Sequence, residues 1–361
     1  MAPLISRLGQ AFGFGAPTGD GGGGSDSPTG TYATGGTVTD SSGTRIHTFT
    51  SSGSFVVINE NLDSVGYLVV AGGAGGSSGG AGGGGAGGLY TTDPAVPSPL
   101  RASNLTVTGN DASPNSYTVT VGAGGLGSPN SAGTRGEEGE DSVFGPITCQ
   151  GGGSGGQPQT EPGDIGQNGG SGGGGSATAA GSGGQGPGGY AAYPGSPNPS
   201  PFRQGYNGGS GYHSANVYIY GGGGGGASQG GTNAPSSGSP VTSNRAGYGG
   251  NGYTLTITGS SKAFGGGGGG GSQPGPNDVT GGNGGTGGGG AGLPGSTSPI
   301  TSTGGEGYND GQDRAGPQTT GGNGGANTGG GGGSANHATG RYAGGEGGSG
   351  IVVVTYPHPA A

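Results

Sequence analysis

Residues 71–88 read AGGAGGSSGGAGGGGAGG, a stretch that contains nothing larger than serine. It directly follows Tyr67-Leu68-Val69-Val70, whose apolar, β-branched and aromatic residues are typical of a buried strand. Glycine loses more conformational freedom on folding than any other residue, and it has no side chain to bury in return. Because 111 of the 361 residues are glycine and only 25% are hydrophobic, disorder is the default expectation that any folded interpretation must overcome.

A three-residue spacing argues against disorder. Ala71, Ala74 and Ser77 are separated by pairs of glycines, and the same interval recurs at Ser154 and Gln157, Asn168 and Ser171, Asn283 and Thr286, Asn323 and Ala326, and Glu346 and Ser349. Three residues per turn is the period of a polyproline-II-type helix, which makes no internal hydrogen bonds. Its backbone groups must therefore find partners in neighbouring segments or in water. The spacing predicts a bundle of parallel and antiparallel glycine helices with Ser, Asn, Thr and Ala on the outer edges. Collagen is the alternative with this period, but it requires an unbroken G-X-Y register rich in proline.

Segments typical of β-strands bracket the glycine tracts. They are 45–50, 54–58, 67–70, 105–107, 117–121, 253–257 and 351–356. Pairing of the last strand with the first ones would close a β-sandwich or jelly-roll-like core, from which the glycine tracts emerge as long insertions. The predicted fold is therefore mainly β, with almost no α-helix.

The dispersion of these strands decides the domain organisation. Length alone would suggest two domains, but each half alone would bury too little apolar surface. We predict one glycine-rich domain over 31–357, preceded by a docking peptide (1–17) and a flexible linker (18–30) and followed by a short tail (358–361).

Four runs carry a family resemblance: IHTFTSSGSFVV, GYLVVAGGAGGSSGGAGGGGAGG, SYTVTVGAGG and NTGGGGGSANHATGRYAGGEGGSGIVVVTYP. Over roughly residues 31–357 the chain resembles the glycine-rich domain of bacteriophage tail-fibre and other virion structural proteins. The resemblance implies a β-rich scaffold with polyglycine-type helices, which in some tip adhesins carries variable loops that recognise the host surface. Animal receptor ectodomains with glycine-rich regions look broadly similar. The single cysteine and the absence of an evident signal peptide favour the phage interpretation.

The amino-terminal segment MAPLISRLGQAFGFGAP has a different character. Its apolar residues are too few and too interrupted for a membrane span or the core of a secretory signal. Either it is a poorly ordered end, or it docks into a partner virion protein. The docking candidates are Leu4, Ile5, Leu8, Phe12 and Phe14. The expected location is the virion, after synthesis in the host cytoplasm without a signal peptide or membrane insertion.

Charge and motifs argue against nucleic-acid binding and nucleotide chemistry. Nine basic and 18 acidic residues give a net charge of −9, which leaves no basic footprint for nucleic acid. Lys262 is the only lysine, and no G-K-[ST] occurs. Ser154 fits G-x-S-x-G, but such a match is expected by chance in a chain of this composition, and Ser154 lacks the strand-to-helix context of a nucleophile elbow. We predict no enzymatic activity, although a polysaccharide-degrading enzyme built from distant carboxylates stays as a third hypothesis.

Metal and cofactor sites are not predicted. His47, His213, His337 and His358 lie far apart, and Cys149 has no partner for a disulfide, so a small buried residue is expected there. The acidic groups 137–141 and 310–313 could offer oxygen ligands to calcium, but they are better interpreted as solvated surface loops.

The aromatic and proline-rich region 190–220 departs most from the glycine background. Proline limits loop conformations, and tyrosine offers a flat surface with a polar tip, so this region suits recognition of a sugar or a protein. The receptor-binding candidates are Tyr193, Phe202, Arg203, Tyr206 and Tyr212. Tyr218 and Tyr220 are interpreted instead as packing lids over glycine segments.

Two functions follow from these observations. The first is a phage tail-fibre or fibre-tip component that binds a host glycan or protein and is attached to other virion proteins by its amino-terminal peptide. The second is a purely structural, self-assembling virion or appendage protein without a receptor role. Trimers are common among phage fibres, so the resemblance allows a homotrimer, although the sequence shows no heptad repeat.

Overall fold

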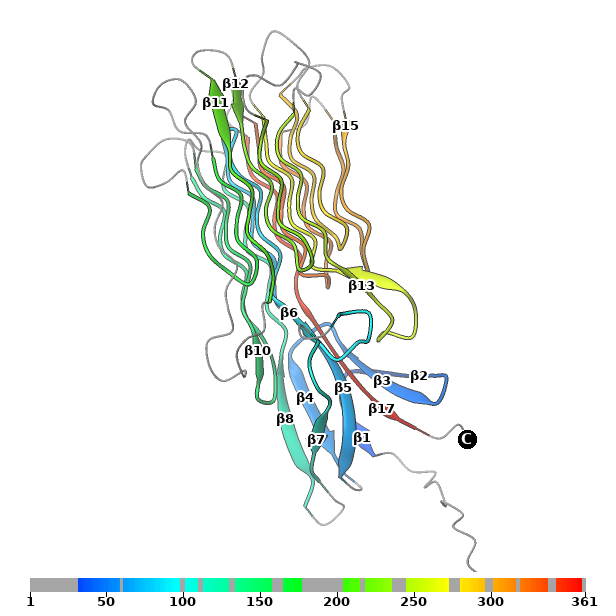
Figure 1. Ribbon diagram of the computed structural model, residues 1–361. Helices are drawn as coiled ribbons and strands as arrows, with labels where there is room; N and C mark the ends of the chain where they lie inside the picture. Colours follow the sequence, from blue (N-terminus) through cyan, green and yellow to red (C-terminus); the bar gives the residue numbers. More distant parts are fainter. Residues whose placement is uncertain are drawn as a thin grey trace, which may run out of the picture.

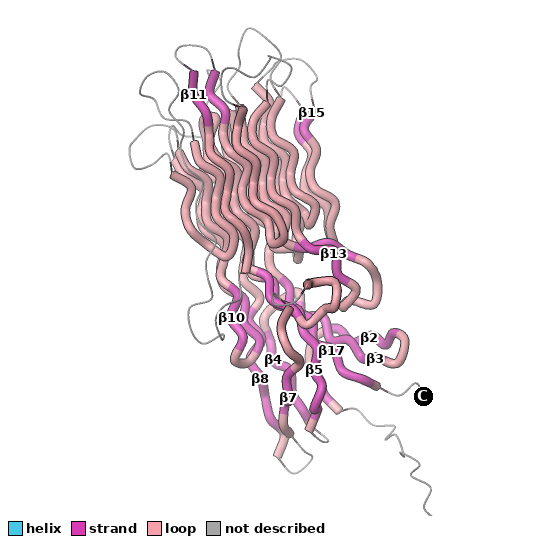
Figure 2. The backbone as a smooth tube through the Cα atoms, viewed as in Figure 1, coloured by secondary structure: helices cyan, strands magenta, loops and turns pink. Residues whose placement is uncertain are grey.

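The chain folds into an elongated body with strands gathered at one end and long segments running side by side toward the other (Figures 1 and 2). The computed structural model describes residues 32–58, 61–97, 101–109, 113–129, 134–157, 165–176, 204–214, 218–235, 245–272, 280–295, 301–315, 319–336 and 342–358. Within these ranges the regular structure consists of β-strands, and no helix occurs. The mainly β fold predicted from the sequence is confirmed.

Two antiparallel sheets form the strand-rich end, here called the proximal end. The first has the order β1 (Ala33–Thr34), β4 (Gly53–Val57), β8 (Asn115–Thr120), β9 (Ser142–Phe144), β10 (Ile147–Cys149). The second has the order β2 (Thr37–Ser41), β3 (Thr44–Phe49), β17 (Ile351–Pro357), β5 (Leu62–Val70), β6 (Leu89–Thr91), and β7 (Leu105–Val107) also pairs with β5. All seven predicted strands are present, although their ends differ by a few residues.

The carboxy-terminal strand β17 is the centre of the second sheet. Val353 lies opposite Thr48 of β3 on one side and Leu68 of β5 on the other. The predicted pairing of the last strand with the first ones is therefore confirmed. Side chains alternate along β17, as the two-residue period of a strand requires.

The alternating faces of β17 enter two separate hydrophobic cores. Val352, Val354 and Tyr356 belong to a core that they share with Phe55 and Phe144 of the first sheet. The rings of Phe55 and Tyr356 are 6.4 Å apart, so the two sheets face each other across this core. Ile351 and Val353 point the other way, into a second core.

Three short antiparallel hairpins complete the described strands. They are β11 (Tyr212–Ser214) with β12 (Tyr218–Tyr220), β13 (Tyr253–Leu255) with β14 (Lys262–Phe264), and β15 (Thr301–Ser302) with β16 (Arg314–Ala315). Leu255 and Phe264 fill the second core, so the β13–β14 hairpin covers the face of the second sheet that the first sheet leaves open. Figure 1 shows β11, β12 and β15 at the opposite extremity, here called the distal end.

The glycine segments between the two ends are joined by backbone hydrogen bonds. Within residues 82–88, every third amide donates to the same neighbouring segment, and the partner changes by three residues at each step. The pairs are Gly82–Gly156, Gly85–Gly153 and Gly88–Gln150, then Gly83–Gly222 and Ala86–Gly225, then Gly84–Gly332 and Gly87–Gly329. In the second series the partner numbers rise along the segment, so the two segments are parallel. In the other two series the partner numbers fall, so those segments are antiparallel.

The carbonyls of the same segment face three further segments. They accept from amides of 71–77, of 171–174 and of Gly268; for example, Ala74 donates to Gly85, Ser171 to Ala86 and Gly268 to Gly84. Residues 82–88 are thus surrounded on all sides by other segments. The lateral hydrogen bonding predicted from the three-residue spacing is confirmed.

Close approach explains the demand for glycine. A methyl group added at Gly84 would lie 2.2 Å from the carbonyl oxygen of Ala74, and one at Gly268 would lie 2.1 Å from that of Gly332. Neither distance leaves room for a Cβ atom. Gly79 and Gly80 have φ angles of 91° and 73°, so the turn between segments 71–78 and 81–88 uses the left-handed region that glycine favours.

The predicted outer position of the small residues is wrong for 71–88. Ala71, Ala74, Ser77, Ser78, Ala81 and Ala86 are all buried. The reason is that this part of the chain lies in the middle of the bundle, so it has no outer edge. Elsewhere the prediction is correct for Asn168, Thr286, Ala326 and Glu346, which are exposed, and wrong for Ser154 and Ser171, which are buried.

Cys149 occupies the shared core, as a small buried residue. Its thiol donates to the carbonyl of Val69 at 3.3 Å, and burial raises its pKa above the ordinary value. Since only the thiolate attacks disulfide reagents, native Cys149 should not react with Ellman's reagent over hours, whereas chain unfolded in guanidinium should react within minutes. Rapid reaction under native conditions would contradict the burial.

His47 makes folding stability sensitive to acid. It is fully buried, Nδ1–H donates to the carbonyl of Gly35 at 2.8 Å, and burial lowers its pKa below the ordinary 6.5. The unfolded chain therefore binds a proton at higher pH than the folded chain does. Stability from this residue is complete above about pH 6.5 and falls as the pH is lowered from there toward the folded pKa. Urea unfolding between pH 5 and pH 8 should show this slope, and His47→Asn should reduce it. If the slope were unchanged in the variant, groups other than His47 would be responsible for the pH dependence.

Candidate binding surfaces

The proximal and distal ends of the molecule are formed by different parts of the described chain. The described chain begins and ends at the proximal end, where the rings of Tyr32 and His358 are 6.0 Å apart. The hairpins β11–β12 and β15–β16 flank residues outside the described ranges, and Figure 1 places β11, β12 and β15 at the distal end. The glycine segments thus separate β11, β12 and β15 from Tyr32 and His358.

Some of the predicted receptor-binding residues lie within the described ranges, and others lie outside them. Tyr193, Phe202 and Arg203 lie outside the described residues, as do the docking candidates Leu4, Ile5, Leu8, Phe12 and Phe14. Tyr206 is half-buried, and its amide donates to the carbonyl of Gly226. Tyr212 is only 4% exposed and packs with Tyr220 and Ala234, so a ligand would meet little of its ring. The burial of Tyr220 agrees with its interpretation as a packing lid.

The acidic groups singled out from the sequence act as hydrogen-bond acceptors for the backbone. Asp141 Oδ1 accepts from the amide of Gly151 at 2.8 Å, Asp310 Oδ1 from that of Gly307 at 2.9 Å, and Asp313 Oδ1 from that of Gly304 at 2.8 Å. In the described part of the chain, no group of three or more His, Cys, Asp or Glu residues is arranged to hold a metal ion.

The outermost glycine segments are bonded through asparagine side chains. Four Oδ1 atoms accept from backbone amides of a neighbouring segment at 2.8–3.0 Å: Asn233 from Ser210, Asn251 from Thr286, Asn283 from Thr303, and Asn323 from Glu346. Each oxygen takes the place of the backbone carbonyl that a further segment would supply in the interior of the bundle. We call these side chains the asparagine caps.

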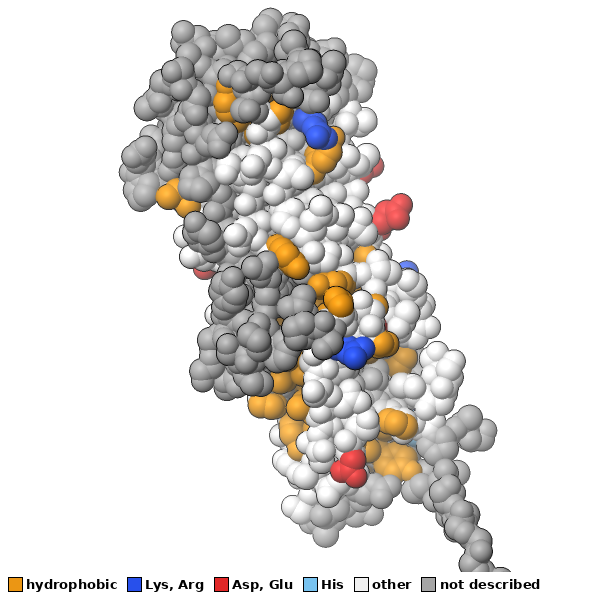
Figure 3. All heavy atoms as spheres, viewed as in Figure 1, with side chains coloured by type: hydrophobic (Ala, Val, Ile, Leu, Met, Phe, Trp, Pro, Cys, Tyr) orange, Lys and Arg blue, Asp and Glu red, His pale blue; other side chains and the backbone are white. Residues whose placement is uncertain are grey.

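The visible surface of the glycine segments is nearly uncharged. Figure 3 shows mostly backbone and neutral side chains on this face, with only scattered basic and acidic groups. No helix in the described ranges has the length and apolar character that crossing a membrane would require.

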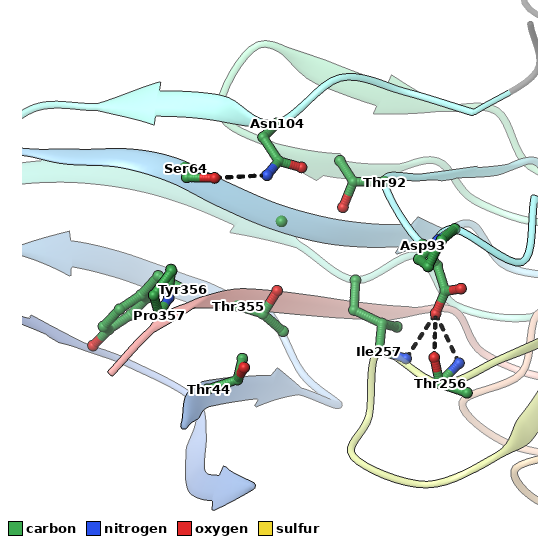
Figure 4. Close-up of a pocket in the computed structure, with 12 residues that line it drawn as sticks. Thr44, Ser64, Thr92, Asp93, Asn104, Thr256, Ile257, Thr355, Tyr356 and Pro357 are labelled. Atoms are coloured by element: carbon green, nitrogen blue, oxygen red, sulfur yellow. Dashed lines mark hydrogen bonds between the residues drawn. The ribbon is translucent and has the colours of Figure 1, made fainter. Parts of the chain in front are cut away.

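A pocket of about 260 Å³ lies at the junction of the second sheet and the β13–β14 hairpin (Figure 4). Hydroxyl groups dominate its lining, and the side chains of Thr44, Ser64, Thr92 and Thr355 all contribute. Gly66 also lines the pocket, and it has no room for a larger residue, because a methyl group there would lie 2.6 Å from Oγ1 of Thr355.

Asp93 is the only carboxylate among the residues lining this pocket, and its oxygens are already occupied. Oδ2 accepts from the amides of Thr256 and Ile257 at 2.7 and 2.8 Å, and Oδ1 accepts from that of Ala95 at 2.8 Å. A pair of carboxylates for acid–base chemistry is therefore not available here. These bonds also explain why the strand predicted over 253–257 stops at Leu255, and they fasten the hairpin to the sheet.

Asp93→Asn should destabilise the fold by about 2–4 kcal/mol. The amide nitrogen that replaces one oxygen cannot accept from a backbone N–H, and bonds to a charged acceptor are among the stronger ones. Chemical denaturation followed by tyrosine fluorescence measures the change. The control is Asp63→Asn at an exposed position of β5, which should stay within about 0.5 kcal/mol. Equal effects of the two substitutions would show that the Asp93 contacts do not hold the junction.

Comparison with known families agrees with this architecture. The sequence matches the family described as glycine-rich domain over residues 50–289, which is more than half of the chain. The chain belongs to the glycine-rich domain family. The match spans β5 and β6 as well as the central segments 71–88 and 221–226. No curated protein matches the chain. The family description names only the glycine-rich domain, so the phage context of the resemblance remains a prediction.

Proposed function

We propose that this glycine-rich domain protein is a non-enzymatic structural protein of a bacteriophage virion. In this proposal it is a tail-fibre or fibre-tip component that displays host-recognition loops on a rigid glycine scaffold. The observation that carries the proposal is the polarity of the molecule. The described chain begins and ends at the proximal end, and the strands β11, β12 and β15 lie at the distal end.

The scaffold in this proposal is a β-sandwich that carries a bundle of polyproline-II-type glycine helices within one domain over 31–357. The polyproline-II-type conformation is supported by the hydrogen bonds, because every third amide donates to the same neighbouring segment. In a helix with three residues per turn, successive amides point in directions about 120° apart, so every third amide meets the same neighbour. Residues 82–88 and residues 221–226 both follow this rule. Each bond contributes about 1 kcal/mol net, so rigidity arises from their number rather than from a large hydrophobic core.

Two sets of partners follow from the polarity. The amino-terminal peptide, with Leu4, Ile5, Leu8, Phe12 and Phe14, would attach the protein to other virion proteins. Tyr193, Phe202, Arg203 and Tyr206 would recognise a host-surface glycan or protein. Tyr212 would contribute by supporting the surface from below, because its ring is buried.

The asparagine caps favour this function over lateral self-assembly. A protein that grew sideways through its glycine segments would need unpaired amides along its flanks. Ser210, Thr286, Thr303 and Glu346 instead donate their amides to side chains of the same molecule. A purely structural protein without a receptor role is the alternative outcome of the test.

The test is binding of the fluorescently labelled chain to a panel of bacterial isolates. We expect binding to a subset of isolates, and at least a tenfold loss in the triple variant Tyr193→Ala/Phe202→Ala/Arg203→Ala. The control is Leu126→Ala/Ile165→Ala, which removes two exposed apolar side chains outside the predicted recognition region. Binding to no isolate, together with assembly of the chain into filaments, would support the purely structural alternative. An equal loss in the control would contradict recognition by these residues.

A further inference from the structure

A groove of about 230 Å³ opens on the flank of the glycine segments. Three neighbouring outer segments form it, and it is lined by Gln229, Gly230, Thr232, Tyr248, Gly249, Asn251, Asn283 and Gly284. Its volume is below the roughly 300–1,000 Å³ of pockets that hold drug-sized ligands, so it suits a group of the size of a single sugar ring. None of the lining residues carries a charge, which argues against an ionic ligand.

The aromatic ring of the groove is held in a fixed orientation. The guanidinium carbon of Arg245 lies 4.0 Å from the centre of the Tyr248 ring, so a cation occupies one face of the ring. The amide of Tyr248 donates to Oγ1 of Thr232 at 2.7 Å, and the carbonyl of Tyr248 accepts from the amide of Thr232 at 2.9 Å. These contacts anchor the residue before any ligand arrives.

The side-chain amides near the ring differ in which of their atoms already make hydrogen bonds. Asn283 Oδ1 accepts from the amide of Thr303, and Gln229 Oε1 accepts from Nδ2 of Asn251. Both amide oxygens are therefore committed to holding the segments together. Within the described part of the chain, no acceptor pairs with Nδ2 of Asn283 or Nε2 of Gln229. The groove thus combines an ordered aromatic ring with amide donors that lack a partner.

We infer that this groove binds a neutral pyranose sugar. The apolar C–H face of such a ring packs on a flat aromatic surface, and its hydroxyl groups accept from amide N–H donors. Tyrosine and asparagine supply these two kinds of contact at low cost in side-chain ordering. The site lies on the flank and does not depend on whether the predicted receptor-binding residues bind anything, so it adds a second ligand surface to the proposed function.

The experiment is saturation-transfer NMR on the full chain with the methyl glycosides of glucose, galactose, mannose, rhamnose and N-acetylglucosamine. We expect transfer to at least one of them at millimolar concentration. Asn283→Asp retains the oxygen that accepts from Thr303, removes the amide donor and adds a negative charge, so affinity should fall at least tenfold while the thermal midpoint stays close to that of the parent. Tyr248→Ala should abolish the transfer, and Tyr248→Phe should retain it.

The matched control is Asn233→Asp. Asn233 makes the same kind of cap, to the amide of Ser210, but it does not line the groove, and its substitution adds the same charge. It should leave sugar binding within twofold of the parent. The inference is overturned if none of the five glycosides shows transfer, or if Asn233→Asp weakens binding as much as Asn283→Asp does. Loss of cell binding in the Tyr193→Ala/Phe202→Ala/Arg203→Ala variant with retained sugar transfer would leave the groove assignment intact.

Discussion

Gly84→Ala is expected to destabilise the folded chain by about 3 kcal/mol or more, the upper end of the cost of overpacking a well-packed interior. The added methyl group would lie 2.2 Å from the carbonyl oxygen of Ala74. Gly84 cannot move aside, because its amide donates to Gly332 and its carbonyl accepts from Gly268. Guanidinium unfolding followed by the fluorescence of the 15 tyrosines, in a chain without tryptophan, measures the change.

The matched control for this substitution is Gly53→Ala at the start of β4. There an added methyl group would make only ordinary contact, with the Phe49 ring at 3.9 Å. Its effect should stay within about 1 kcal/mol. If Gly84→Ala were as mild as Gly53→Ala, segment 82–88 would not be enclosed by backbone on all sides.

Truncation after Gly350 is expected to prevent folding altogether. The deletion removes β17, which pairs with β3 on one side and β5 on the other. It also removes Ile351, Val352, Val353, Val354 and Tyr356 from the two cores. Burial of five large apolar side chains contributes on the order of 10 kcal/mol, which is comparable to the whole stability of a typical domain.

Soluble yield and near-ultraviolet circular dichroism test this expectation. The control is truncation after His358, which retains all of β17 and should leave both measurements unchanged. A soluble truncated chain with the dichroism of the parent would mean that the two sheets close without their central strand. The glycine bundle would then be the part that holds the fold together.

The sequence predicted the type of each segment well. It predicted less well which segments lie next to one another in the fold. Val352 and Val353 predict a strand because they are β-branched, and Ala71, Ala74 and Ser77 predict a three-residue period because glycine pairs separate them. Neither pattern shows which segment lies in the middle of the bundle, since inner and outer segments share the same repeat. That is decided by the order in which the segments pack, and it explains why the small residues of 71–88 were placed on an outer edge.

The candidate surfaces were predicted less completely. Aromatic density drew attention to 190–220, where Tyr212 and Tyr220 prove to be buried packing residues. Tyr248 was missed because it stands alone among glycines. A signal was present in the three-residue interval of Arg245, Tyr248 and Asn251, which places all three side chains on one edge of the segment. Asp93 could not have been found, because its partners Thr256 and Ile257 lie far away in the sequence.

Amide hydrogen exchange of the peptide that spans residues 71–88 tests the central claim most directly. Peptic cleavage near Leu68 and Leu89 would release this peptide from the purified chain. If the segment is enclosed by hydrogen-bonded neighbours, its amides should exchange on the order of 10⁴-fold or more slowly than in an unstructured peptide, which corresponds to opening free energies above about 5.5 kcal/mol. Exchange at the rate of an unstructured peptide would contradict the hydrogen-bonded scaffold and the function proposed from it.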